Sequence, residues 1–329
     1  MNELYPIKFF PIFKDKIWGG DKIRSVLNKD YSPLSNCGET WEVSSVEGDI
    51  SVVSNGVLKG KDLKTIIQEY KGRLLGNKVF EKFGNQFPLL IKFIDAREDL
   101  SIQVHPDDEM ASKRHGSFGK TEMWYVLQAD EGSSVITGFN QEMDKDKYLK
   151  AFKAGTLMDI LNREPAMEGD VFFIPAGRVH TLGKGMLIAE IQQTSDVTYR
   201  IFDFNRKDSE GNYRDLHVEE ALDAMDYQFH DQYKTQYTPI DDEATEIVGC
   251  EYFTTSIISF RHKLTRNYHT LDSFKILIGT SGSAKIVYGD TVEKISKGEV
   301  ILLPASMNEV ILMPEGECRI LETFVSLEK

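Results

Sequence analysis

The chain has 329 residues, of which 41% are hydrophobic and 28% charged, a balance typical of a globular protein with one large or two modest cores. Acidic residues outnumber basic ones by 52 to 39, giving a formal net charge of −13 that argues against a nucleic-acid partner, because such a surface repels polyanions. A small phosphorylated ligand stays compatible with this charge, since a few local cations can hold one phosphate.

Short runs rich in β-branched and aromatic residues dominate the chain, and turn-forming residues bound each of them. In chain order we expect a helix at 61–72, strands at 88–96 and 122–129, two short helices between 143 and 163, strands at 169–177 and 186–193, and a helix at 218–226. This content predicts a mainly β protein.

A polar, acidic stretch at 237–246 interrupts the pattern and predicts a domain boundary. The five runs that follow it (EYFTTSIISF, SFKILIGTSG, SAKIVYG, GEVILLPA and CRILETFVS) indicate a small all-β domain. We therefore predict a catalytic domain at 1–236, with short helical insertions, and a second β domain at 237–329 without a metal site.

The two predicted domains resemble each other weakly. Residues 169–180 align with 298–309, so that Gly169 matches Gly298 and Pro175 matches Pro304. Upstream, residues 122–138 align with residues 273–289 with a small offset. This pattern predicts two related barrels, the second without the histidine, and chance similarity between short apolar strands is the alternative.

The three cysteines, Cys37, Cys250 and Cys318, are far apart and form no CxxC pair, which suits a reducing compartment. The first twenty residues lack the pattern of a signal peptide, and no apolar run approaches the ~20 residues that cross a bilayer. We expect a cytoplasmic protein with no membrane partner.

Residues 169–180 follow the spacing G-x5-P-x-G-x2-H without a gap. A strand that ends at Pro175 and turns at Gly177 would return with His180 pointing inward, because side chains on barrel strands alternate between the two faces. The spacing resembles the second motif of the cupin superfamily, whose histidine binds a metal. It predicts two cupin-type, jelly-roll β-barrels with a few short helices.

A second group of candidate ligands lies in SIQVHPDDEMA. Gln103 and His105 are two residues apart, so on a strand both side chains share one face, and Glu122 opens the next predicted strand. With His180, these residues make a plausible set for Zn²⁺ or a similar divalent ion and leave a position for water or substrate.

Each of these residues also has a structural interpretation when taken singly: a hydrogen-bonded histidine, a turn-capping glutamine or a solvated edge glutamate. Their combination with the 169–180 motif favours a metal site. The other five histidines are interpreted as structural: His115, His217, His230, His262 and His269.

Across nearly its whole length the chain resembles the type I mannose-6-phosphate isomerases, in their short bacterial form. The segments that carry the resemblance are IWGG at 17–20, GETWEVSS at 38–45, PLLIKFIDA at 88–96, LSIQVHPDD at 100–108, GKTEMWYVL at 119–127, IPAGRVHTL at 174–182 and AEIQQTSDVTYRIFDFNR at 189–206. Longer members of the family read NHKPE where this chain has FGKTE, and their helical insertion is reduced here, which leaves open which residues cover the pocket.

The resemblance implies one zinc ion per chain, held by the same four residues, Gln103, His105, Glu122 and His180. It implies catalytic roles for Lys120 beside the metal and for Glu190 and Arg200 at the pocket. It also implies a substrate-binding set: Lys92, Ser101 and Arg206 for the phosphate, and Trp18 in the pocket lining.

The implied reaction moves a proton between C2 and C1 of a sugar phosphate through an enediol, which requires a general base and stabilisation of an oxyanion. Lys120 and Glu190 are the base candidates, with a water on the metal as a third, and Arg200 suits the developing negative charge. Spacing alone leaves other interpretations open, a surface lysine for Lys120 and a simple ion pair with Arg200 for Glu190.

Two other functions stay open at this stage. One is a different cupin enzyme, such as a dioxygenase or another sugar-phosphate isomerase that uses iron or manganese. The glutamine argues mildly against the dioxygenase, whose usual ligands are three histidines or two with a carboxylate. The other is a non-catalytic sugar-binding cupin, against which Lys120 and Arg200 argue. We expect a sugar phosphate as partner, and a monomer or weak homo-oligomer.

Overall fold

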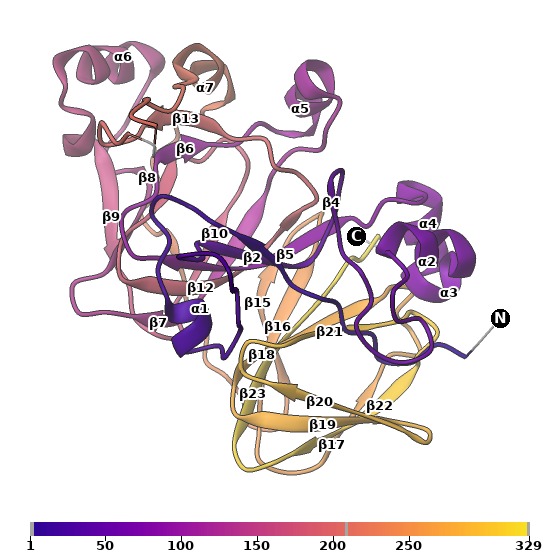
Figure 1. The fold of residues 1–329 in the computed structure, drawn as a ribbon. Helices are drawn as coiled ribbons and strands as arrows, with labels where there is room; N and C mark the ends of the chain where they lie inside the picture. The colour runs from indigo at the N-terminus through magenta and orange to yellow at the C-terminus, as the bar shows by residue number, and fades with distance from the viewer. Residues whose placement is uncertain (1–2, 208–209, 328–329) are drawn as a thin grey trace. The chain divides into compact units, whose positions relative to one another are not determined.

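The computed structural model describes residues 3–207 and 210–327, and it is mainly β (Figure 1). Its helices are α1 (Lys22–Ser25), α2 (Leu63–Tyr70), α3 (Gly72–Leu75), α4 (Asn77–Phe83), α5 (Asp108–His115), α6 (Lys145–Ala154) and α7 (Val218–Ala224), with one 3₁₀ turn, η1 (Leu157–Asp159). Within the described ranges, no helix is both long enough and apolar enough to span a lipid bilayer.

The strands up to the predicted boundary are β1 (Ile12–Lys14), β2 (Glu39–Val43), β3 (Ser45–Val46), β4 (Asp49–Ile50), β5 (Leu89–Ala96), β6 (Ile102–Val104), β7 (Glu122–Ala129), β8 (Ser134–Phe139), β9 (Leu161–Pro165), β10 (Val171–Ile174), β11 (His180–Leu182), β12 (Met186–Gln193), β13 (Tyr199–Phe202) and β14 (Lys234–Thr235). Those beyond it are β15 (Ala244–Gly249), β16 (Thr254–Phe260), β17 (Leu264–Asn267), β18 (Lys275–Ser281), β19 (Ser283–Tyr288), β20 (Thr291–Ser296), β21 (Val300–Leu303), β22 (Glu309–Pro314) and β23 (Cys318–Phe324).

The chain divides into two compact units. Unit 1 comprises the described parts of 1–12, 41–91 and 236–329, and unit 2 comprises 13–40 with the described parts of 92–235. Compactness assigns no function to either unit, so the division into a catalytic domain at 1–236 and a second domain at 237–329 stays a prediction.

The residues of unit 2 form most of two sheets that face each other. One has the order β1-β2-β5-β12-β7-β10-β14, and the other has the order β13-β6-β11-β8-β9. Val135 of β8 and Leu182 of β11 share one buried cluster with Trp124 of β7 and Phe172 of β10. Residues of both sheets therefore line a common interior.

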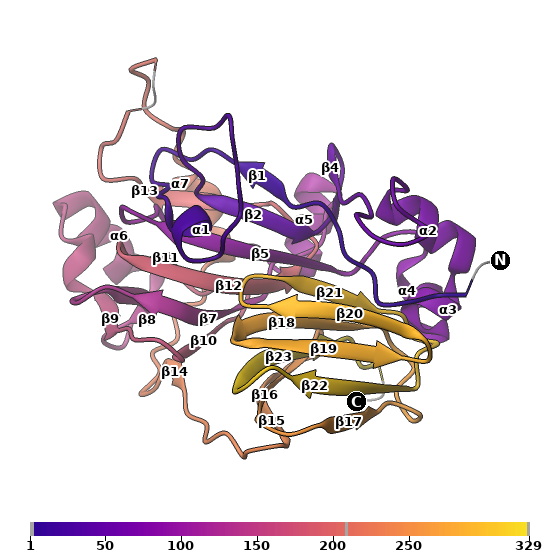
Figure 2. The same cartoon turned by 60° about the horizontal axis from the view of Figure 1, so that its bottom comes forward.

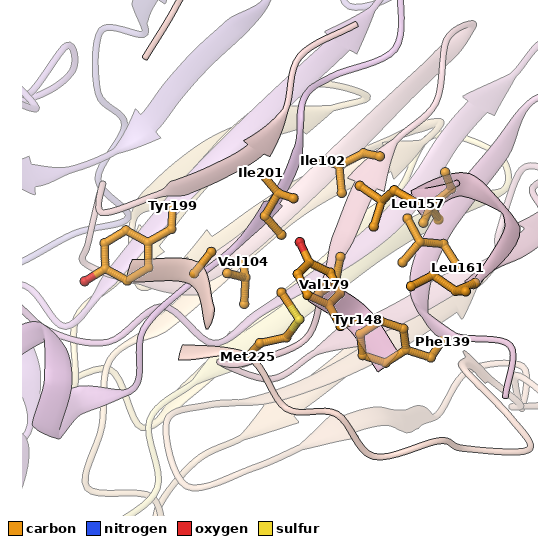
Figure 3. Packing of buried hydrophobic residues seen from close by; sticks show 13 residues of the cluster. Ile102, Val104, Phe139, Tyr148, Leu157, Leu161, Val179, Tyr199, Ile201 and Met225 are labelled. Atoms are coloured by element: carbon orange, nitrogen blue, oxygen red, sulfur yellow. The ribbon is translucent and has the colours of Figure 1, made fainter. Parts of the chain in front are cut away.

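The opposite face of the five-stranded sheet is covered by α6, η1 and α7. Ile102 and Val104 of β6 and Ile201 of β13 pack there against Tyr148 of α6 and Leu157 of η1 (Figure 3). Because side chains alternate along a strand, this packing fixes which residues point outward. The residues between them point into the interior of unit 2.

The turn between β10 and β11 has the conformation that the sequence spacing predicts. Gly177 has a φ of +88°, which favours glycine, and an added Cβ would lie 3.0 Å from the Ala224 carbonyl oxygen. The Gly177 N–H donates to the His105 carbonyl at 2.9 Å, and its carbonyl accepts from Asp226 N–H at 2.8 Å. The hydrogen bond from Gly177 therefore connects the turn before His180 to the backbone of His105.

Most predicted elements are confirmed, with one exception. The strands at 88–96, 122–129, 169–177 and 186–193 are present as β5, β7, β10 and β12, and the helices at 61–72 and 218–226 are present as α2 and α7. Of the two helices predicted between 143 and 163, α6 is confirmed and the second is wrong. That segment is the single turn η1 followed by β9, which pairs with β8, because strand pairing outweighs the local helical pattern.

In unit 1, one sheet has the order β15-β16-β23-β18-β21, and a second has the order β17-β22-β19-β20 (Figure 2). Its strand register repeats that of unit 2. Glu122 is opposite Ile174, the residue before Pro175, and Lys275 is opposite Leu303, the residue before Pro304.

A second pair of positions also corresponds between the units. Glu190 is opposite Trp124, two residues beyond Glu122, and Glu322 is opposite Leu277, two residues beyond Lys275. Two matching register pairs favour the internal repeat over chance similarity. Lys275 and Glu322 thus hold the places of Glu122 and Glu190.

Lys275 is completely buried, and its ammonium donates to the carbonyls of Pro304 at 3.2 Å and Met307 at 2.9 Å. Burial lowers the pKa of Lys275 to about 8, although the nearby Glu322 carboxylate acts to raise it. In the unfolded chain this lysine stays protonated up to pH ~10.4. Between pH 8 and 10 the folded protein therefore binds fewer protons than the unfolded chain, and the free energy of unfolding rises with pH.

We predict that wild type gains about 2 kcal/mol of unfolding free energy relative to Lys275→Met between pH 7 and 9.5, because only the wild type releases a buried proton. Urea titrations of both proteins at several pH values measure the difference. A difference that is independent of pH would show that Lys275 stays protonated in the folded protein up to pH 9.5, so that burial does not lower its pKa.

Candidate metal centre and active site

Three predicted ligands converge in the interior of unit 2. His105 follows β6, Glu122 opens β7 and His180 opens β11, and one ligand atom from each lies within 4.8 Å of the others. His180 Nε2 is 3.4 Å from Glu122 Oε1, and His105 Nε2 is 3.6 Å from Glu122 Oε2. All three side chains are buried.

Gln103 joins this group through its amide. Gln103 and His180 are opposite each other on β6 and β11, and Gln103 Nε2 lies 3.3 Å from His180 Nε2. A half-turn of the amide exchanges its nitrogen and oxygen, so the oxygen can face the same point as the imidazole nitrogens.

Both imidazoles are held in the tautomer that a metal requires. His105 Nδ1 lies 3.0 Å from the Val197 carbonyl and His180 Nδ1 lies 2.8 Å from the Arg178 carbonyl, so each donates there and keeps Nε2 as an acceptor that is directed into the site. Burial lowers the pKa of His180 to about 3 and, with the Lys120 ammonium, holds the pKa of His105 well below its usual range. Both rings are therefore neutral at physiological pH.

The Glu122 carboxylate completes a donor set that suits a cation. Neither of its oxygens receives a well-formed hydrogen bond, although both are buried. Burial raises the pKa of Glu122, and the Lys120 ammonium, 2.8 Å from Oε2, opposes this. Lys120 Nζ is also 3.0 Å from His105 Nε2. Two neutral imidazoles and a carboxylate that is paired only with Lys120 at Oε2 fit a divalent metal such as zinc.

Glu190 lies on β12, which pairs with β7 in the same sheet, and carries a second buried carboxylate. Its Oε1 accepts from Trp124 Nε1 at 2.9 Å, and its Oε2 lies 3.1 Å from Lys92 Nζ. Burial alone would raise the pKa of Glu190, but Lys92 and Lys120 outweigh it and lower this pKa. Glu190 is therefore ionised at neutral pH and able to accept a proton.

Lys92 balances this carboxylate. Burial would lower the pKa of Lys92, but the nearby Glu190, Glu39 and Glu122 carboxylates outweigh burial and raise it. Its ammonium lies 3.9 Å from Glu39 Oε2 as well as beside Glu190. The structure thus places Lys92 between carboxylates, and its predicted contact with phosphate stays a prediction.

Arg200 and Arg206 belong to a separate cationic group. Arg206 and Arg214 both donate to the buried carboxylate of Asp203, Arg206 also donates to the Asp99 carbonyl, and Arg200 donates to the Asp215 carbonyl at 2.8 Å. Burial, and then the charge of Arg214, lowers the pKa of Arg200. Three guanidinium groups thus lie near the carboxylates of Asp203 and Asp215, which leaves the group with a net positive charge.

Ser101 and Trp18 are the two other residues predicted to contact the substrate. Ser101 Oγ lies 3.5 Å from Gln103 Oε1, beside the ligand group. Trp18 is buried in the interior cluster that also contains Trp124. Neither arrangement tests the substrate contacts predicted for these two residues.

Sequence reasoning missed two residues of this region, Arg214 and Trp124. Arg214 lies outside every motif, and only its pairing with Asp203 places it beside Arg206. Trp124 was within reach, because it is two residues beyond Glu122 on the same strand and therefore shares its face.

Comparison with known proteins shows which family this chain is similar to. Residues 7–143 match the family model described as phosphomannose isomerase type I, catalytic domain. The chain is 33% identical to mannose-6-phosphate isomerase ManA of Bacillus subtilis over 317 residues, which cover 95% of this chain and 97% of the relative. The chain belongs to the type I phosphomannose isomerase family. A relative from Streptococcus mutans, mannose-6-phosphate isomerase, is also 33% identical, over 92% of this chain and 96% of its own length.

Solved structures of the family share the fold. The crystal structure of the mannose 6-phosphate isomerase from Bacillus subtilis matches with a TM-score of 0.85 at 33% identity, covering 97% of this chain and 99% of that one. A putative mannosephosphate isomerase from Archaeoglobus fulgidus matches with a TM-score of 0.78 at 21% identity, over 98% and 99% of the two chains. The mainly β, cupin-type fold predicted from the sequence is thereby confirmed.

Glu122 and Glu190 offer a matched test of the ligand set, because both are buried carboxylates on neighbouring strands of one sheet. We predict that Glu122→Gln retains about a tenth or less of the wild-type metal after dialysis, since it loses a charged ligand, whereas Glu190→Gln retains nearly all of it. Elemental analysis of the purified proteins measures this. Equal metal content in the two variants would remove Glu122 from the ligand set.

Proposed function

We propose that this protein is a zinc-dependent mannose-6-phosphate isomerase that interconverts mannose 6-phosphate and fructose 6-phosphate. Membership of the type I family supports the reaction class. The observation that carries the proposal is the convergence of His105, Glu122 and His180 from three separate segments, with the charged groups of Lys120 and Glu190 beside them.

In this proposal Gln103, His105, Glu122 and His180 hold one zinc ion per chain. The metal supplies Lewis-acid polarisation of the sugar oxygens, which acidifies the adjacent C–H bond. The neutral state of both imidazoles supports this role, because a protonated ring could not act as a ligand.

Glu190 and Lys120 share the proton transfer between C2 and C1. Glu190 is the group that accepts the carbon-bound proton, because the Lys92 and Lys120 ammonium groups keep it ionised and Trp124 fixes its orientation. Lys120 is the donor that neutralises the enediolate oxygen, since its ammonium is held among the ligands by Glu122.

The substrate phosphate binds at the group formed by Arg200, Arg206 and Arg214. A phosphate monoester carries about −1.5 to −2 charges at pH 7, which the net positive charge of this group attracts. Asp203 holds two of the guanidinium groups in fixed positions, which lowers the entropy lost when the phosphate binds.

The activity is tested with purified protein, mannose 6-phosphate and a coupled assay for fructose 6-phosphate. We expect turnover that EDTA abolishes and added zinc restores, because the ligand set is needed to polarise the substrate. Turnover that is indifferent to EDTA in protein shown to be metal-free would contradict the zinc assignment. Substrate binding without turnover would indicate a sugar-binding protein instead.

Lys120→Ala separates catalysis from metal binding. We expect this variant to keep its zinc and to lose about 10²- to 10⁴-fold in kcat, the usual contribution of a positioned acid or base. Lys113→Ala, on the exposed surface of α5, is the control and should match wild type. A Lys120→Ala enzyme with wild-type kcat would exclude Lys120 from the proton transfer.

A further inference from the structure

In the described part of the chain, buried polar side-chain atoms without a hydrogen bond are concentrated in unit 2. Nine such side-chain atoms are found in residues 3–207 and 210–327, and six of them belong to Glu122, Glu190, Arg200, Thr137 and Gln192 of unit 2. Folded proteins satisfy most buried polar atoms, so a concentration of unsatisfied ones points to a missing ligand. The first three of these residues already have a role in the proposed reaction, whereas Thr137 and Gln192 have none.

Thr137 shares the inner face of the five-stranded sheet with the predicted metal ligands. It is directly opposite His180 in the β8–β11 pair, and His180 is opposite Gln103 on β6. Its neighbours confirm the direction, because Val135 lies in the interior cluster whereas Ile136 lies in the cluster under α6. The Thr137 hydroxyl is therefore inside unit 2, completely buried, and without a partner.

Gln192 occupies the corresponding place on the other sheet. It is opposite Glu122 in the β12–β7 pair and two residues from Glu190, so all three side chains share one face. Its Nε2 donates to the carbonyls of Gln193 at 2.8 Å and Ser195 at 2.6 Å. These two bonds fix the amide and leave Oε1 as an immobilised acceptor without a donor.

The chemistry of these two groups distinguishes them from the rest of the site. A threonine hydroxyl both donates and accepts, and an amide oxygen only accepts, so neither compensates the charge of a phosphate. Both suit a neutral hydroxyl group, which offers a donor and an acceptor. A buried group left unpaired costs free energy that such a ligand would recover.

We propose that Thr137 and Gln192 bind hydroxyl groups of the sugar, one from each wall of the interior, and so determine which sugar phosphates are accepted. This proposal rests on the isomerase function proposed above. Thr137 acts from the wall that carries His180 and Gln103, and Gln192 acts from the wall that carries Glu122 and Glu190. A substrate that lacks the corresponding hydroxyl leaves the protein atom buried and unpaired, and is therefore discriminated against.

The first test is Thr137→Val, which keeps the shape and removes the hydroxyl. We expect kcat/KM for mannose 6-phosphate to fall about tenfold. With 3-deoxy- and 4-deoxy-mannose 6-phosphate as alternative substrates, the difference between wild type and variant should vanish for the one analogue that lacks the bound hydroxyl. Gln192→Met is expected to give the same pattern at a different hydroxyl.

Thr181→Val is the matched control, because the Thr181 hydroxyl already donates to the Leu100 carbonyl at 2.8 Å. We expect the control to lower the melting temperature and to leave the substrate preference unchanged. Thr137→Val should leave the melting temperature unchanged or raise it, since it removes a hydroxyl that is unpaired without substrate. Opposite effects on stability and on kcat/KM separate binding from a structural role.

The outcomes distinguish this proposal from the function on which it rests. If wild type turns over mannose 6-phosphate but both variants keep wild-type kcat/KM, or lose it equally on every analogue, the hydroxyl-binding role is overturned. If wild type itself has no turnover, the proposed isomerase function fails, whatever the variants do.

Discussion

The interior of unit 2 depends on a balance among buried charges. Glu122 and Glu190 contribute two carboxylates, and Lys92 and Lys120 contribute two ammonium groups, all within the space between facing sheets. A single ionised group in such a place is costly, and removing one member leaves its partner uncompensated. The strands that carry these residues are therefore constrained by their side chains as much as by the apolar cluster around Trp124.

Sequence patterns were sufficient to select the candidate ligands because the position of each on its strand depends on local geometry. The spacing from Gly169 to His180 specifies a strand, a turn at Gly177 and a return, all of which the structure contains. Arg214 could not be found in this way, since its partner Asp203 is reached only in the folded chain. The strand β9 was missed for a related reason, because its pairing with β8 is not encoded in its own helical pattern.

Alternation along strands also determines which further residues share the interior with the candidate ligands. Once Gln103, Glu122 and His180 are taken as inward-facing, every second residue on their strands and the residues opposite them face inward too. Trp124, Thr137 and Gln192 follow from that rule and the strand register alone. Register is the part that a single sequence does not provide, because it depends on pairing between distant segments.

In unit 1 the residues at the same register positions have hydrogen-bond partners within the chain. Glu322 holds the register position of Glu190, yet Arg266 Nη2 donates to its Oε1 at 2.6 Å and the Tyr268 hydroxyl donates to its Oε2. Lys275, at the register position of Glu122, has two carbonyl acceptors and lies 4.5 Å from the Tyr268 ring.

Equivalent positions thus support two different interiors. In unit 1 the buried charges are closed by partners in the same chain, and this network contributes to a unique packed core. In unit 2 both oxygens of Glu122 lack a hydrogen bond, so the folded chain alone does not complete the network. Because the two units share the strand register, the fold itself does not require unit 2 to leave these atoms without hydrogen bonds. We therefore attribute the unpaired atoms of unit 2 to its function.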